Sequence, residues 1–144
     1  MSILSVAIIL FIILEASNVI ILYFKPDSKL GNGIAVFNAW EKSKKDTEMH
    51  EFVKYLVYWV AGTKLIFIAL LIVILLTAGE TTKLLSVIAL ILSIASFYWR
   101  LFPIIRGLDK RGQITPLGYS KTLGIMIGVF ITIFCLSLLL EFVL

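Results

Sequence analysis

The chain alternates long apolar runs with short polar stretches. A helix needs about 20 mostly apolar residues to cross the hydrocarbon core of a bilayer. Four runs reach that length, at residues 3–24, 52–77, 84–105 and 119–144. We therefore expect an all-α integral membrane protein whose four transmembrane helices form a bundle, with residues 1–144 making one domain.

The polar stretch after the first run contains a second pattern. Ile34, Phe37 and Trp40 recur every third residue, and charged residues follow them. On a helix this spacing collects the apolar side chains on one face. It predicts a short amphipathic helix at about residues 34–44. Such a helix is suited to lying in the membrane interface, and packing against the end of the bundle fits the pattern equally well.

Two polar residues mark expected helix starts. Asp46 is a favourable N-cap, so the second helix is expected to begin near Thr47, before the membrane is reached. Thr115 is a similar cap, and Pro116 suits the first position of the helix that leads into the fourth run. Both signals place helical turns outside the apolar runs themselves.

Composition supports a membrane location and narrows the partners. Of 144 residues, 60% are hydrophobic and 15% are charged, whereas soluble domains average about 45–50% apolar residues. The net charge of +4 alone would suit nucleic acid. The basic residues lie beside the apolar runs, however, which favours anionic lipid headgroups over nucleic acid. The predicted headgroup contacts are Lys42, Lys45, Arg106, Lys110 and Arg111.

Lys and Arg also predict the orientation. They gather in the polar stretches after the first and third runs, and such stretches normally stay in the cytoplasm. We expect a multi-pass protein of the cell membrane with both termini outside. All three Trp and all five Tyr fall toward the same side, which predicts either a one-sided anchor belt or an aromatic-walled cavity. The cavity candidates are Tyr58, Trp59, Tyr98 and Trp99.

Two ionisable residues interrupt the apolar runs far from their ends. Glu15 lies nine residues before Phe24, and Lys64 lies ten residues after Lys54. At a rise of about 1.5 Å per residue, Glu15 lies about 13 Å from Phe24 and Lys64 about 15 Å from Lys54, both counted from the same side of the membrane. A lone charge at mid-membrane costs roughly 2.5–3.5 kcal/mol on insertion scales. We therefore predict that Glu15 and Lys64 meet, either to fix helix register or to handle a proton or substrate.

Smaller polar residues extend this pair. Asn18 follows Glu15 by three positions and so shares its helix face, while Thr63 precedes Lys64. The third run adds a stripe of serines that ends at an arginine. The predicted intramembrane cluster contains Glu15, Asn18, Thr63, Lys64, Ser93, Ser96 and Arg100.

The fourth run carries small residues four positions apart, at Gly124, Gly128 and Thr132. A ridge of small residues lets two membrane helices approach closely. This ridge predicts helix packing, either within the bundle or in a homodimer.

Motifs for catalysis or metal binding are missing from the sequence. His50 and Cys135 are the only histidine and cysteine, so neither a zinc-type ligand set nor a disulfide framework is available. Glycine-rich phosphate loops and nucleophile motifs are also absent. We predict no metal, no cofactor and no catalytic residue.

Three classes of function fit these features. The sequence favours an accessory or scaffold protein with an intramembrane Glu–Lys pair and a cytoplasm-facing aromatic and basic rim, acting with itself as a homo-oligomer or with another membrane protein. An alternative is a small oligomeric transporter, coupled to protons or ions, that uses Glu15 and Lys64. A lipid-modifying enzyme is the third. A transporter needs a hydrated path to Glu15, whereas a scaffold keeps the pair dry.

Overall fold

The computed structural model describes residues 2–30 and 32–143, and the regular structure within them is helical. Four stretches are long and apolar enough to cross a membrane: α1, α3, α4 with α5, and α6. The helices are α1 (Ile3–Phe24), η1 (Ile34–Val36), α2 (Asn38–Ser43), α3 (Thr47–Thr77), α4 (Glu80–Ala95), α5 (Phe97–Lys110) and α6 (Tyr119–Val143).

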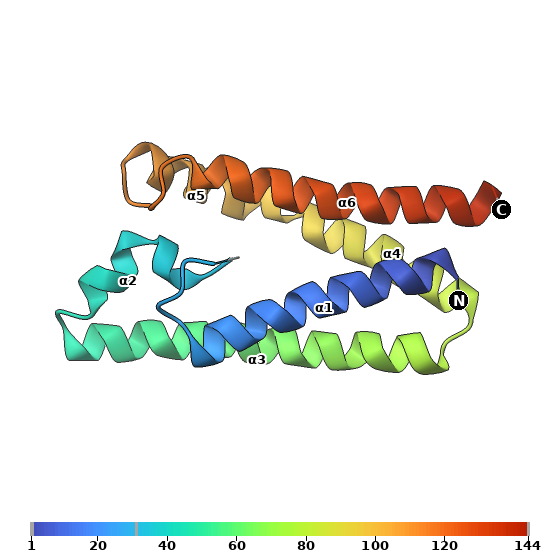
Figure 1. The fold of residues 1–144 in the computed structure, drawn as a ribbon, viewed down its shortest axis with the longest axis horizontal. Helices are drawn as coiled ribbons and strands as arrows, with labels where there is room; N and C mark the ends of the chain where they lie inside the picture. The colour runs from blue at the N-terminus through green and yellow to red at the C-terminus, as the bar shows by residue number, and fades with distance from the viewer. Residues whose placement is uncertain (1, 31, 144) are drawn as a thin grey trace.

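The long helices run side by side along one axis (Figure 1). α1 packs against both α3 and α6, and α4 and α5 pack against α6. The start of α1, the α3–α4 connection and the end of α6 lie at one end of the molecule, which we call the terminal end. α2 and the α5–α6 connection lie at the opposite end, called here the loop end.

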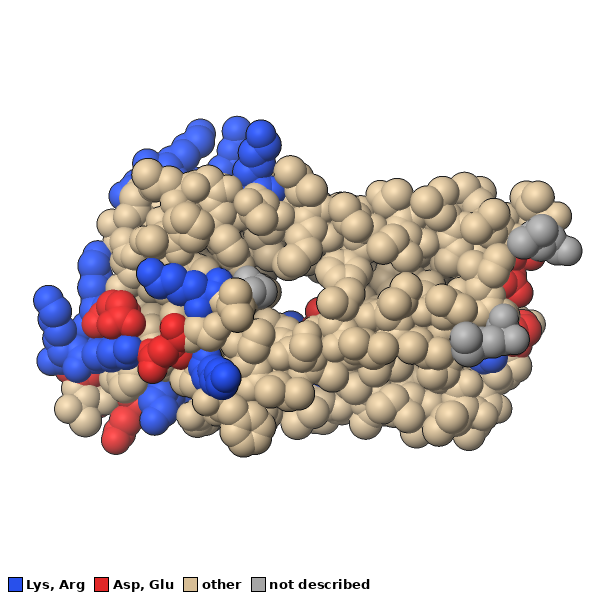
Figure 2. Space-filling model, viewed as in Figure 1, with Lys and Arg blue, Asp and Glu red and all other residues tan. Residues whose placement is uncertain are grey.

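Charge follows the same division. In Figure 2, Lys and Arg gather at the loop end, and the middle of the visible face is almost free of charged residues. Large apolar side chains such as Ile13, Leu70 and Leu92 are exposed along the middle of the helices. Exposed apolar surface on this scale marks an interaction surface, and these helices are long and apolar enough for that surface to face the hydrocarbon of a membrane.

The third apolar run forms a longer and interrupted helix. Helical structure extends beyond the apolar run of residues 84–105 at both ends, from Glu80 to Lys110. It breaks at Ser96, whose hydroxyl donates to the Ser93 carbonyl over 2.6 Å. Serine that bonds back to its own helix tends to bend it.

Residues 34–44 do not form the single predicted helix. Phe37 is extended and forms an isolated antiparallel bridge with Ile114, which separates η1 from α2. The Asn38 N–H donates to the Gln113 carbonyl over 2.9 Å. Pairing with the α5–α6 connection therefore replaces helical hydrogen bonds at this point. Trp40 is 2% exposed, so it packs against protein.

The two predicted helix starts had opposite outcomes. Asp46 caps α3 by accepting from the Met49 N–H over 3.1 Å, and α3 begins at Thr47 as predicted. The prediction at Thr115 is wrong, because α6 begins at Tyr119. The Thr115 N–H donates to the Val36 carbonyl over 2.8 Å, so this residue joins the two connections instead of capping a helix.

Asp109 takes over the capping role at α6. This buried carboxylate accepts from the Gly118 N–H at 2.9 Å, and from the Ser120 N–H at 2.9 Å and hydroxyl at 2.6 Å. A negative charge at a helix N-terminus is favourable because it faces unpaired N–H groups. Asp109 thereby fixes the end of α5 to the start of α6.

Candidate functional site

A polar cluster lies halfway along α1 and α3. Lys64 Nζ on α3 lies 2.7 Å from Glu15 Oε2 and 2.8 Å from Asn18 Oδ1, both on α1. Glu15 and Asn18 lie three positions apart, so they present their polar atoms to the same neighbour. The structure thus brings together the two charges whose matched depth predicts a meeting.

The amide nitrogen of Asn18 is left without an acceptor. Because the Lys64 ammonium is a donor only, the amide oxygen of Asn18 must face it, and the amide nitrogen must point elsewhere. That nitrogen is buried and has no hydrogen-bond partner among the described residues. A buried unpaired donor costs about 1–3 kcal/mol.

The ion pair lines an open cleft. This cleft, of about 880 Å³, lies between α3 and α4 and has α1 at its base. Glu15, Lys64, Trp59 and Ser93 contribute to its walls, which are otherwise mostly apolar. We call it the α3–α4 cleft. Its volume falls within the range of about 300–1,000 Å³ that is typical of small-molecule sites.

A second cavity lies on the loop-end side of the pair. This inner cavity, of about 410 Å³, is bounded by Asn18, Phe37 and Ile105, among others. Val60 and Lys64 line both spaces, so the Lys64 side chain stands at the boundary between them. Figure 2 shows the molecule hollowed near mid-length, with acidic and basic atoms at the rim of the opening.

Only part of the predicted polar cluster assembles around the pair. Thr63 and Ser93 line the α3–α4 cleft, and the Thr63 hydroxyl donates to the Trp59 carbonyl. Ser96 and Arg100 line neither space among the described residues. The Arg100 guanidinium instead lies 5.0 Å from the ring centre of Trp99 on the outer surface. Ser96 and Arg100 therefore lie outside the polar group around the pair.

The four aromatic candidates also separate. Trp59 lines the α3–α4 cleft. Tyr58 stacks on Tyr23 at 5.6 Å, Tyr98 donates to a carbonyl of α6, and Trp99 is exposed beside Arg100. The structure therefore does not gather these rings into a single cavity.

Two of the three small residues on α6 lie against α5. A Cβ atom added at Gly124 would lie 2.8 Å from the Phe102 ring, and one added at Gly128 would lie 3.1 Å from Tyr98 Oη. Thr132 is exposed and donates to the Gly128 carbonyl. The two glycines therefore allow close packing within the chain.

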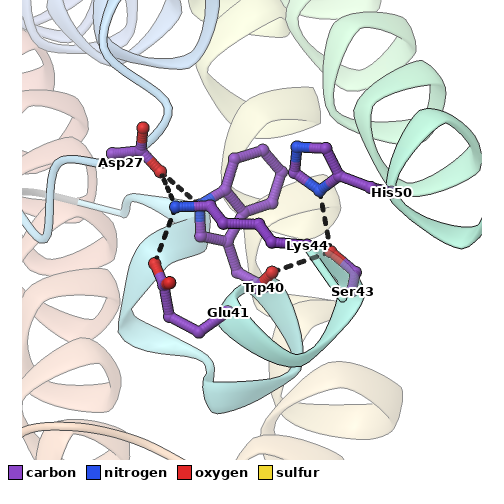
Figure 3. A network of polar contacts seen from close by, with 6 residues as sticks. All are labelled: Asp27, Trp40, Glu41, Ser43, Lys44 and His50. Atoms are coloured by element: carbon purple, nitrogen blue, oxygen red, sulfur yellow. Dashed lines mark hydrogen bonds and ion pairs between the residues drawn. The ribbon is translucent and has the colours of Figure 1, made fainter. Parts of the chain in front are cut away.

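A second polar network, absent from the sequence-based predictions, joins α2 to its neighbours at the loop end (Figure 3). Asp27 Oδ1 accepts from Lys44 Nζ and from Trp40 Nε1, each at 2.6 Å, and Lys44 also donates to Glu41 at 2.9 Å. The hydrogen bonds from Lys44 and Trp40 lower the pKa of the Asp27 carboxyl below its ordinary value. Those to Asp27 and Glu41 raise the pKa of Lys44.

His50 completes this network from α3. The Ser43 hydroxyl donates its one hydrogen to the Trp40 carbonyl over 2.7 Å. Its 2.9 Å contact with His50 Nδ1 therefore requires the hydrogen on Nδ1 of the imidazole. The His50 ring also packs on the Trp40 ring, with the ring centres 4.8 Å apart. The histidine is thus engaged in fixing α2, and the described residues contain no group of three or more metal-ligating side chains.

The predicted headgroup contacts lie at the loop end. Lys42 is tied back by a 2.7 Å hydrogen bond from its Nζ to the Gln113 side chain. All five are exposed, and the remaining four are Lys45, Arg106, Lys110 and Arg111.

No family model, no curated protein and no solved structure matches this sequence. The described residues form a helical protein with four stretches able to cross a membrane and an ion pair at the wall of a cleft.

Proposed function

We propose that this is an accessory membrane protein that binds an uncharged amphiphilic small molecule, taken from the bilayer into the α3–α4 cleft. The observation that carries the proposal is the position of the Glu15–Lys64 pair on the wall of that cleft. The two side chains keep 21% and 23% of their surface exposed. A pair that served only to fix helix register would be expected to lie fully between α1 and α3.

The surroundings of the cleft indicate how a ligand arrives. Trp59 and Leu70 line the cleft and are also exposed on the outer surface of α3. With these helices in a bilayer, the opening faces hydrocarbon, so a ligand that enters must be lipid-soluble. Its apolar part would replace lipid chains against the apolar walls.

The polar part of the ligand follows from the charge of the site. Glu15 and Lys64 together are neutral, and adding a further charge in low dielectric would be costly. Two of the three Lys64 donors are used by Glu15 and Asn18, which leaves one for a ligand. Glu15 can accept at its second oxygen. A hydroxyl or amide, which both donates and accepts, fits this pair.

A transport role has one observation of its own. Lys64 lies at the boundary of the cleft and the inner cavity, with an acceptor on each side. If the Lys64 side chain released one of these acceptors and kept the other, it would open one space toward the other. This favours the transporter alternative over the enzyme alternative.

The experiment uses thermal unfolding of the purified protein in detergent, with oleyl alcohol as the probe and octadecene as the probe without a polar group. Oleyl alcohol should raise the unfolding temperature of the unmodified protein, because a ligand that binds only the folded state stabilises it. Octadecene should have a much smaller effect. No difference between the two probes would contradict the proposal.

A matched pair of variants locates the site. Ala89 lines the cleft and is exposed, so Ala89→Trp should fill the cleft and abolish the response to oleyl alcohol. Leu92 is exposed on the same helix and does not line the cleft, so Leu92→Trp should keep the response. Equal responses in both variants would place binding elsewhere.

A further inference from the structure

A separate hollow lies on the α5–α6 face, at the loop end. It measures about 520 Å³ and shares no lining residue with the α3–α4 cleft or the inner cavity. Arg106 of α5 and Lys121 of α6 contribute its charged lining, whereas Phe102, Ile125 and Gly128 contribute its apolar lining. The hollow therefore has a cationic part and an apolar part.

The shape of the hollow is built into the packing of α5 on α6. Gly124 has no side chain, and the Phe102 ring occupies the space where a Cβ atom would lie. The Tyr98 hydroxyl donates to the Gly124 carbonyl, which fixes the second ring against α6. These contacts give the hollow a rigid aromatic floor.

The electrostatics favour an anion at the cationic part. Arg106 and Lys121 are exposed and come from two different helices. The neighbouring carboxylate, Asp109, is buried and accepts hydrogen bonds from Gly118 and Ser120 at the start of α6. The two cations therefore remain available to a ligand. A phosphate group between Arg and Lys side chains gains charge-assisted hydrogen bonds.

The apolar part extends along α6 from this charged end. Lys121 and Gly128 lie seven residues apart, which is about 10 Å along a helix. On the predicted orientation, the direction from Lys121 to Gly128 runs from the headgroup region into the hydrocarbon. The order of phosphate and then acyl chain in a phospholipid matches this direction.

We propose that the α5–α6 hollow binds one anionic phospholipid, with its phosphate at Arg106 and Lys121 and one acyl chain over Gly124 and Gly128. This site is independent of the α3–α4 cleft. Its ligand is charged and sits at the headgroup level, whereas the ligand of the cleft is neutral and deep.

The test measures binding of dioctanoylphosphatidylglycerol, dioctanoylphosphatidylcholine and inorganic phosphate to the full chain in detergent by calorimetry. The anionic lipid should bind at least about tenfold more tightly than the zwitterionic one. The double variant Arg106→Gln/Lys121→Gln should lose that preference. The control Lys25→Gln/Lys29→Gln removes the same charge from exposed sites in the α1–η1 connection and should keep it.

A second pair of variants separates a lipid site from a simple phosphate site. Ile125 is 58% exposed, so Ile125→Trp should fill the apolar part without disturbing the core. It should weaken lipid binding severalfold and leave binding of inorganic phosphate unchanged. Leu136→Trp, on the same helix and outside the hollow, should change neither. Equal affinity for the two lipids, or unchanged lipid binding in Ile125→Trp, would overturn the proposal.

Discussion

Two ion pairs of nearly equal length have different roles in this molecule. Lys64 lies 2.7 Å from Glu15 at mid-helix, and Lys44 lies 2.6 Å from Asp27 at the loop end. The side chains of the first pair are 21–23% exposed, whereas Asp27 is 67% exposed. Exposed pairs contribute little because water screens them and solvates each partner well. Breaking a poorly solvated pair leaves a costly single charge. The surroundings of a pair therefore determine its energetic contribution more than its length does.

The comparison of the two ion pairs assumes that the loop end lies in water, on the cytoplasmic side of the membrane. Thiol labelling tests this location in an all-or-none manner. With Cys135 replaced by Ala, an impermeant thiol reagent added to intact cells should label Thr81→Cys and not Lys45→Cys. Both positions are exposed, so burial does not explain a difference. Labelling of Lys45→Cys alone would reverse the orientation. It would also contradict the assignment of the Lys- and Arg-rich end to the cytoplasm.

Breaking the mid-helix pair should give the largest loss of stability. Lys64→Met leaves Glu15 as a single charge, and we expect unfolding in bicelles to become easier by about 3 kcal/mol. Combining it with Glu15→Gln should recover most of this loss, because no unpaired charge remains. A double-mutant cycle measures the coupling. If the losses of the two single variants simply add, the pair is not coupled as described.

The loop end also contains a carboxylate that is buried, and it extends the comparison. Asp109→Ala removes the acceptor for three donors at the start of α6. We expect a loss of about 2 kcal/mol, since the donors near Ser120 remain poorly solvated. Asp109→Asn keeps an oxygen acceptor and should lose less. A loss at Asp109 as small as that at Asp27 would show that burial is not the deciding factor.

The exposed pair, Asp27 and Lys44, should contribute least to stability, and the pH dependence of unfolding measures its contribution. Because the folded-state pKa of Asp27 is lowered, its contribution is present above the unfolded pKa of about 3.9 and is lost as the pH falls through the lower, folded value. The raised pKa of Lys44 gives a contribution that is lost as the pH rises through that raised value. Asp27→Asn should flatten the acid side of the stability profile. We expect its loss at neutral pH to be about one-fifth or less of that at Lys64.

Apolar length and depth could be predicted from the sequence because both depend on one helix at a time. The ends of α1 and the start of α3 follow from local signals, and Asp46 is adjacent to the helix that it caps. The meeting of Glu15 and Lys64 could be predicted because two helices that both span a bilayer share one measure of depth. Which face each helix presents depends on its neighbours, so the positions of Ser96 and Arg100 outside the cleft could not be predicted.

The remaining features depend on contacts between distant segments. Phe37 leaves the helical conformation because Ile114 is its neighbour in space, and Asp109 caps a helix that begins ten residues later. Capping rules examine only the residue just before a helix, so they selected Thr115 instead. Gly124 and Gly128 indicated a close approach, yet their spacing did not identify Phe102 and Tyr98 as the side chains that approach.

The backbone hydrogen bonds between residues 36–38 and 113–115 also constrain when the loop end can form during biosynthesis. The Val36 carbonyl and the Asn38 N–H find their partners at Thr115 and Gln113, which the ribosome adds long after the first two helices have been made. Until then α2 can already pack on α3, but residues 36–38 lack these two partners, and the inner cavity lacks its α5 and α6 walls. The ion pair joins helices made early, so both of its partners exist before the cavity that it borders can be completed. The loop end can therefore close only after Thr115 has been added, whereas both partners of the ion pair are present much earlier.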